Sequence, residues 1–144
     1  MPHNSITRLR LRSLFTLPAF ARETRLISAQ LRAAPGFIDG AVLAEGRLVF
    51  WTRSTWESLD AMKAFRDSGA HRESMPKLMT WCDEAAVVQW EGEPAADWDA
   101  IYARMAGEGR LSRVKAPTSA HTARRFARML RWSPEQPIRP APAG

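Results

Sequence analysis

The sequence lacks most of the patterns that identify familiar chemistry. Only one of its 144 residues, Cys82, is a cysteine, so no disulfide can form within the chain, which suits a reducing compartment. No apolar run approaches the ~20 residues that cross a bilayer. There is no Gly-x-Gly-x-x-Gly pattern and no Gly-Lys-Ser/Thr loop, which excludes the common nucleotide fingerprints. The three histidines, His3, His71 and His121, stand far apart, and no metal site is predicted.

The first 22 residues carry arginines and no acidic residue, and a short apolar stretch from Leu14 to Phe20 follows the first arginines. A secretory signal has a similar order of charge and apolar residues. This stretch is at the short end for such a signal, and Pro18 interrupts it. The sequence therefore favours a cytoplasmic protein without a membrane span.

Positive charge is concentrated near the end of the chain. Residues 1–102 hold 12 Lys and Arg against 13 Asp and Glu, whereas residues 103–144 hold 9 against 2. A basic tail can attract nucleic acid, an anionic membrane or an acidic partner. No base-stacking aromatic residues alternate with these arginines, so a nucleic-acid partner is not expected.

Hydrophobic periodicity predicts a strand, a helix, a hairpin, a two-part helix and a strand in the first part of the chain. Leu9 and Leu11 alternate with arginines, as in a half-buried strand, and Pro18 suits the first turn of a helix. The predicted elements are a strand at 7–15, a helix from 18, strands at 37–44 and 47–54, a helix from 55 that Gly69 breaks, and a strand at 84–90.

This order is the ferredoxin-like β-α-β-β-α-β arrangement, an α+β fold with four antiparallel strands and helices on one face. The other face of the sheet should be bare, and we expect an identical subunit to cover it. Residues 1–94 are predicted to form this domain. Residues 95–144 are predicted to form a basic helical extension, with helices at 97–107 and 119–131, and a Pro-rich tail that is disordered or draped. We expect the extension and the tail to pack on the domain or on the partner subunit.

Three short patterns resemble a known family. These are Pro35-Gly36-Phe37 before the second strand, Trp56-Glu57-Ser58 at the start of the second helix, and Ser68-x-x-His71. Over about residues 6–91 the chain resembles the antibiotic-biosynthesis-monooxygenase-like superfamily of dimeric α/β barrels. The resemblance implies a homodimer and a monooxygenase-like oxidoreductase. The superfamily also contains haem-using enzymes, isomerases and proteins without catalytic activity, so whether this chain is an enzyme stays open.

A longer pattern, Phe-x-x-Ser-Gly-Ala-His-Arg-x-Ser-Met-Pro at residues 65–76, is similar to spheroidene-monooxygenase-like proteins of an uncharacterised branch. It contains His71, which is the candidate catalytic residue, either as a general base or as a haem ligand. The alternative role is to stabilise the carbonyl end of the preceding helix. In haem-degrading relatives the residue that binds the haem iron lies about one turn further along, at the position of Met75 here. The resemblance therefore leaves two alternatives for the cofactor, none or haem.

The remaining candidate residues concern binding. Trp51, Trp56 and Phe65 are predicted to shape a pocket between sheet and helices for a hydrophobic or aromatic small molecule. The alternative for the tryptophans is a place in the hydrophobic core, which is expected for at least half of those in the domain. Arg10 lies in a row of arginines on the first strand and could bind an anionic group, or it could pair with acids on a wet face. The predicted function is a monooxygenase-like protein that binds or oxidises such a molecule. The alternative is a non-catalytic ligand-binding or structural dimer.

Overall fold

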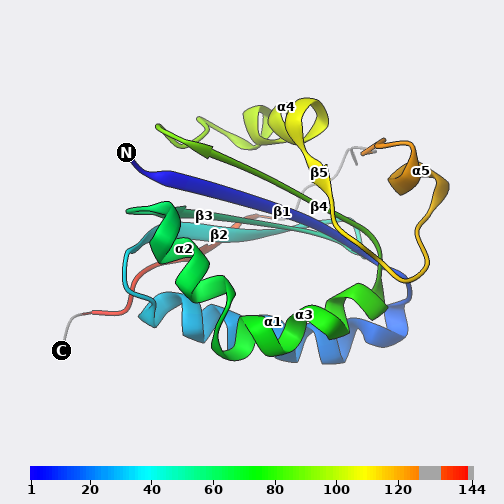
Figure 1. Cartoon of the computed structure of the whole chain (residues 1–144). Helices are drawn as coiled ribbons and strands as arrows, with labels where there is room; N and C mark the ends of the chain where they lie inside the picture. The colour runs from blue at the N-terminus through cyan, green and yellow to red at the C-terminus, as the bar shows by residue number, and fades with distance from the viewer. Residues whose placement is uncertain (127–133, 143–144) are drawn as a thin grey trace.

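The computed structural model describes residues 1–126 and 134–142, and it has one sheet with helices on both faces (Figure 1). No helix in these two ranges is long and apolar enough to span a membrane. The elements are β1 (His3–Leu11), a 3-10 turn (Leu14–Thr16), α1 (Leu17–Ala33), β2 (Phe37–Glu45), β3 (Val49–Trp56), α2 (Leu59–Arg66), α3 (Gly69–Trp81), β4 (Cys82–Glu91), α4 (Trp98–Glu108), β5 (Arg110–Leu111), α5 (Ser119–Thr122) and β6 (Gln136–Ile138).

The six strands form one antiparallel sheet in the order β5-β4-β1-β3-β2-β6. The four central strands belong to the predicted β-α-β-β-α-β unit, which confirms the α+β ferredoxin-like fold. The two edge strands, β5 and β6, come from the C-terminal extension. They hydrogen-bond the outer strands β4 and β2, whose edges would otherwise present unpaired backbone groups.

Local sequence explains where the helices of the central unit begin and end. Pro18 lies in the first turn of α1, and Gly36 follows its end with φ of 83°, a conformation that glycine adopts without strain. The hydroxyl of Ser58 accepts a hydrogen bond from the backbone N–H of Ala61 and caps α2. Gly69, with φ of 57°, separates α2 from α3, as the sequence predicted.

The C-terminal extension differs from the prediction in its second helix. The helix expected over residues 119–131 ends at Thr122, because Arg124 adopts a left-handed φ of 59° that does not continue a right-handed helix. Its last part, residues 127–131, lies outside the described residues. The tail, which was expected to be disordered or draped on the domain or partner subunit, lies on the domain and forms β6, in which Ile138 pairs with Gly40 of β2.

Both faces of the sheet carry helices of this chain. Helices α1, α2 and α3 lie on one face, and α4 and α5 lie on the other (Figure 1). Ile101 and Met105 of α4 form one buried cluster with Ile6, Trp51 and Phe126. The expectation of a bare second face was therefore wrong, because the apolar stripe of the chain's own extension packs against it.

Candidate functional site

A cavity of about 270 Å³ lies between the sheet and helices α1, α2 and α3. Its floor is the sheet face formed by Ser5, Thr7 and Leu9 of β1 and by the residues that share their side of the neighbouring strands. Its walls are mostly apolar. The lining includes Phe20, Ile27, Leu31, Trp56, Met62, Phe65, Met75, Leu78, Met79, Val87 and Ile138. An apolar cavity with a few polar side chains is the usual form of a small-molecule site.

His71 lies in the first turn of α3 and lines this cavity. Its backbone N–H donates to Oε1 of Gln30 at 2.8 Å, and its ring Nδ1 lies 3.0 Å from the carbonyl oxygen of Arg66. Because a carbonyl only accepts, Nδ1 must carry the proton, and Nε2 of the neutral ring then has a free lone pair. Burial lowers the pKa of His71 below its ordinary value, which favours this neutral form. The arrangement provides an oriented base that is uncharged near pH 7.

Aromatic rings extend from His71 along one side of the cavity. The ring of Phe65 lies 5.1 Å from that of His71 and 5.2 Å from that of Trp56, centroid to centroid. Nε1 of Trp56 donates to the hydroxyl of Ser54 at 2.9 Å, which satisfies its polar atom. The structure thus brings three of the predicted site residues, His71, Trp56 and Phe65, to one wall. Such a wall suits contact with a flat apolar or aromatic molecule.

The cavity also contains an acid that the sequence analysis missed. The carboxylate of Glu23 accepts hydrogen bonds of 2.6 Å from both Lys77 and Ser74. The bond from Lys77, followed by that from Ser74, lowers the pKa of Glu23, so it stays ionised and is not a proton donor at neutral pH. A signal was present in the sequence, because Glu23 lies three residues after Phe20 and four before Ile27, on the inward stripe of α1.

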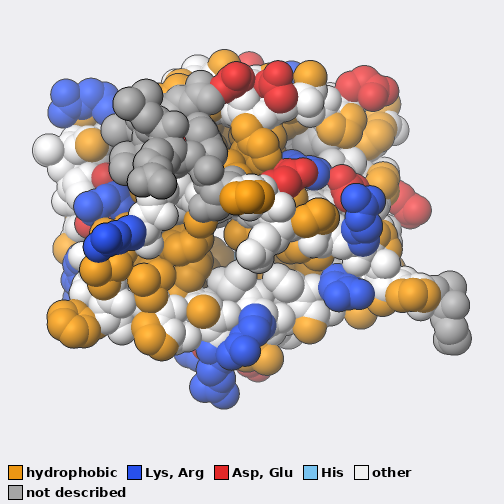
Figure 2. All heavy atoms as spheres, turned by 180° about the vertical axis from the view of Figure 1, so that it is seen from behind, with side chains coloured by type: hydrophobic (Ala, Val, Ile, Leu, Met, Phe, Trp, Pro, Cys, Tyr) orange, Lys and Arg blue, Asp and Glu red, His pale blue; other side chains and the backbone are white. Residues whose placement is uncertain are grey.

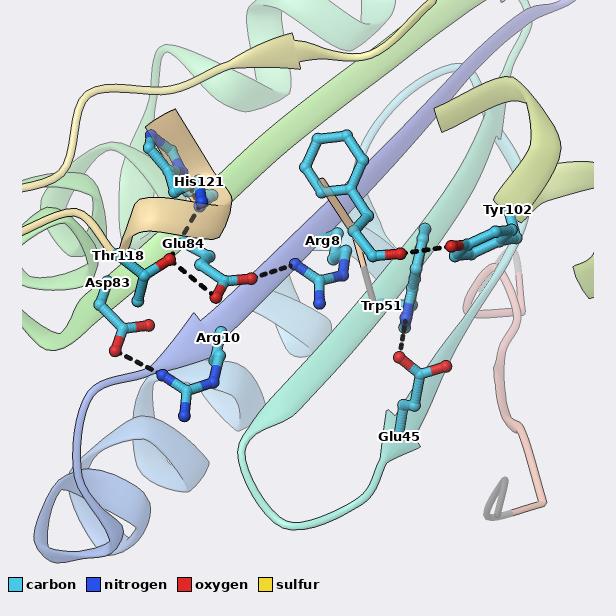
Figure 3. Close-up of polar contacts among 11 residues, drawn as sticks. Arg8, Arg10, Glu45, Trp51, Asp83, Glu84, Tyr102, Thr118 and His121 are labelled. Atoms are coloured by element: carbon cyan, nitrogen blue, oxygen red, sulfur yellow. Dashed lines mark hydrogen bonds and ion pairs between the residues drawn. The ribbon is translucent and has the colours of Figure 1, made fainter. Parts of the chain in front are cut away.

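The other two predicted binding residues, Trp51 and Arg10, lie on the opposite face of the sheet. Side chains alternate along a strand, so Trp51 points away from the side of Thr52 and Ser54, which line the cavity. Trp51 is fully buried, and its Nε1 lies 3.5 Å from a carboxylate oxygen of Glu45 (Figure 3).

Arg10 on that face forms an ion pair with Asp83 (Figure 3). This contact agrees with the alternative given for the arginines of the first strand, in which they pair with acids on a neighbouring strand.

A polar network joins the extension to this second face. The buried Arg8 donates to Glu84 at 2.8 Å, and the hydroxyl of Thr118 donates to the other oxygen of Glu84 at 3.0 Å (Figure 3). Nδ1 of His121 accepts the backbone N–H of Ala85 at 3.3 Å. These contacts hold α5 against β4. Arg8 and His121 therefore stabilise the packing of the extension against the sheet.

The arginines of the extension also make contacts within the chain. The guanidinium of Arg104 lies 4.2 Å from the ring centroid of Trp90, and Arg124 donates to the carbonyl of Gly109. Viewed from behind, Lys and Arg side chains are spread among hydrophobic and acidic ones (Figure 2). A continuous basic stripe, as nucleic-acid binding requires, is not seen on this face.

The size of the cavity decides whether haem, the cofactor suggested by the resemblance, can bind there. Pockets for drug-sized ligands measure roughly 300–1,000 Å³, and a haem macrocycle is a larger ligand. A cavity of about 270 Å³ does not fit haem, although Nε2 of His71 is of a suitable ligand type. Among the described residues no group of three or more His, Cys, Asp or Glu side chains is placed to hold a metal ion.

Part of the chain is similar to a known family. Residues 17–77, which include α1, the hairpin and most of α3, match the family model described as antibiotic biosynthesis monooxygenase. No curated protein matches the chain.

Several solved structures are similar in fold. A putative antibiotic biosynthesis monooxygenase from Nitrosomonas europaea has a TM-score of 0.58 at 16% identity, over 63% of this chain and 89% of that one. A mutant of SnoaB, a cofactor-independent oxygenase from Streptomyces nogalater, has a TM-score of 0.56 at 12% identity, over 66% and 96%. A dimeric ferredoxin-like protein of unknown function from Thermobifida fusca has a TM-score of 0.53 at 20% identity, over 64% and 92%. The chain is therefore similar to the antibiotic biosynthesis monooxygenase family over residues 17–77, and it shares the fold of these solved structures.

Proposed function

We propose that this protein is an oxygenase that binds a hydrophobic, aromatic small molecule in the cavity and oxidises it with O₂ without a cofactor. The observation that carries the proposal is His71, with Nδ1 occupied by the Arg66 carbonyl and Nε2 available in an apolar cavity. The aromatic wall of Trp56 and Phe65 supports the substrate class. SnoaB, which shares the fold, is described as a cofactor-independent oxygenase.

The chemistry follows from the properties of a neutral imidazole in an apolar site. Nε2 of His71 takes a proton from an acidic C–H or O–H group of the substrate, which leaves an electron-rich anion. That anion transfers electrons to O₂, and a new C–O bond forms. For a substrate such as anthrone, the CH₂ group becomes a C=O group, so one oxygen atom enters the product and the other leaves in water with the two hydrogens.

The test measures O₂ consumption and anthraquinone formation from anthrone by the purified protein. In the variant His71→Asn the side-chain amide can still donate to the Arg66 carbonyl, but the base is gone. We expect its rate to fall by about 10²-fold or more, as for loss of a general base. Glu73→Gln, at an exposed position on the same helix, should leave the rate unchanged. An unchanged rate in His71→Asn would contradict the proposal.

The second candidate function is a non-catalytic ligand-binding protein. The hydrogen bond from Nδ1 of His71 to the Arg66 carbonyl favours it, because this contact by itself stabilises the end of α2. The same assay separates the two functions. A binding protein would retain anthrone in the cavity and produce no anthraquinone above the rate in buffer, with or without His71.

We also propose that the protein is a homodimer. The Thermobifida fusca protein, which shares the fold, is described as dimeric, and oligomers of this kind are usually symmetric pairs. Sedimentation velocity of the full chain should give twice the mass of one chain. A single species with the mass of one chain at all concentrations would contradict the dimer, and it would leave the cavity of each subunit as described.

A further inference from the structure

Two arginines of the C-terminal extension, Arg110 and Arg113, line the same cavity as His71. Both lie outside residues 17–77, the part that matches the family model. Strand β5 brings them there, because Arg110 pairs with Val87 of β4 and so takes the cavity side of the sheet. The next residue, Leu111, packs with the apolar cluster on the opposite face.

The backbone after β5 continues along the open edge of the cavity, between β4 and α3. The N–H of Ser112 donates to the carbonyl of Ala85 at 2.9 Å, and the N–H of Lys115 donates to that of Met79 at 3.0 Å. Ala85 and Met79 themselves line the cavity. The segment is therefore fixed at both ends, and Arg113 between them is held at the rim.

The charges around the cavity are not balanced. Glu23 is already neutralised by Lys77, at 2.6 Å, and Arg66 is paired with Asp67 at 2.8 Å. Arg110 and Arg113 are exposed, and neither forms an ion pair with any residue in the described ranges. Two cationic side chains thus lie at the rim of an apolar cavity with no acid assigned to them.

We infer that the substrate carries an anionic group, such as a carboxylate, which Arg110 and Arg113 bind while the aromatic body lies against Trp56 and Phe65. The inference rests on the proposed function and narrows its substrate class to aromatic acids. A guanidinium matches a carboxylate with two parallel hydrogen bonds, so two arginines at one rim select for such a group. They act in binding and orientation, and His71 remains the base.

The test compares two ligands of the same shape, 1-naphthoate and its neutral analogue 1-naphthamide, by titration calorimetry. We expect the wild-type protein to bind naphthoate roughly tenfold more tightly, and this preference to weaken with added salt. The double variant Arg110→Gln/Arg113→Gln should lose the preference and bind naphthamide as before. Arg125→Gln, an exposed arginine of the extension that does not line the cavity, should keep the preference.

A further variant shows where the ligands bind. Ser28 lines the cavity, so Ser28→Phe should fill part of its volume and weaken the binding of both naphthoate and naphthamide. Naphthoate binding that is unaffected by Ser28→Phe would place the anion on the outer surface and overturn the inference.

The other outcomes separate this inference from the proposed function. If the wild type binds both ligands equally, or if the preference survives in the double variant, the inference of an anionic substrate bound by Arg110 and Arg113 is wrong. The proposal that the cavity binds an aromatic molecule is then unaffected. If neither ligand binds, the inference and the proposed cavity function fail together.

Discussion

The protonation of His71 decides what the cavity can do. Its ring is half-buried beside Phe65, and burial is the main reason why its pKa lies below the ordinary value of 6.5. The fold therefore favours the neutral ring at pH 7. For the same reason, the stabilising contribution of the neutral ring is present above the unfolded pKa and is lost as the pH falls through the lowered folded pKa.

We expect kcat/KM for anthrone to be constant above pH 6.5 and to fall at lower pH, with its midpoint below 6.5. The reason is that protonation of Nε2 removes the base. The measurement is the rate from about pH 5 to pH 8, with the residual rate of His71→Asn as the control, which should not show this midpoint. A midpoint above the ordinary value of histidine would contradict the buried, neutral ring.

Cys82 should be unreactive in the folded protein. It is buried, and burial, followed by the charge of Asp83, raises the pKa of its thiol to about 12. Because the thiolate is the reactive form, the native protein should not react with Ellman's reagent at about pH 8. The same protein in denaturant should release one equivalent of chromophore. Rapid reaction of the native protein would show that the β4 end of α3 opens to solvent.

At the scale of elements, the turn between α1 and β2 depends on one glycine. Gly36 has φ of 83°, and a Cβ there would lie 2.6 Å from Cβ of Ala61 on α2. The turn therefore sets how closely α2 approaches the end of α1, next to Phe65 and the cavity.

Gly36→Ala should lower the free energy of unfolding by about 1–3 kcal/mol, because both the backbone conformation and the contact with α2 become strained. Urea denaturation followed by circular dichroism measures the change. Gly107→Ala in α4 is the matched control, since a Cβ there meets nothing within 4 Å, and it should stabilise by about 0.5–1 kcal/mol. Equal effects of the two substitutions would contradict the role of the turn.

At the scale of the whole molecule, the extension completes both the core and the cavity. Its helix α4 buries Met105 against the second face of the sheet, β6 extends the sheet beside β2, and Ile138 reaches the cavity. The described parts of the chain should therefore unfold together, although the family match ends within α3.

Met105→Ala should lower the free energy of unfolding by about 2–5 kcal/mol, the usual cost of truncating a fully buried methionine. The loss should appear as one shifted transition, seen alike by circular dichroism and by tryptophan fluorescence. Ala103→Ser, at an exposed position of the same helix, should have little effect. Two separate transitions would mean that α4 unfolds independently of the sheet.

The sequence by itself determined the order and kind of the central elements. Alternation in β1 and the breaks at Gly36 and Gly69 are local features, and local steric and hydrogen-bonding preferences act on them directly. The start of the second helix was predicted less well, because α2 begins at Leu59 with Ser58 as its cap and not at 55. The same periodicity, together with the resemblance, was enough to select His71, Trp56 and Phe65, and the structure brings these three residues to one wall of the cavity.

Only the tertiary structure decided which face each strand residue takes and what the extension contacts. Trp51 and Trp56 lie five residues apart on β3, and an odd spacing places two side chains on opposite faces of a sheet. The sequence does not show which of the two faces borders the cavity. Arg110 and Arg113 reach the cavity through a two-residue strand, and Ile138 reaches it through a three-residue strand. Strands this short have almost no periodicity of their own, and they form because an edge of the folded sheet offers hydrogen-bond partners from distant parts of the chain.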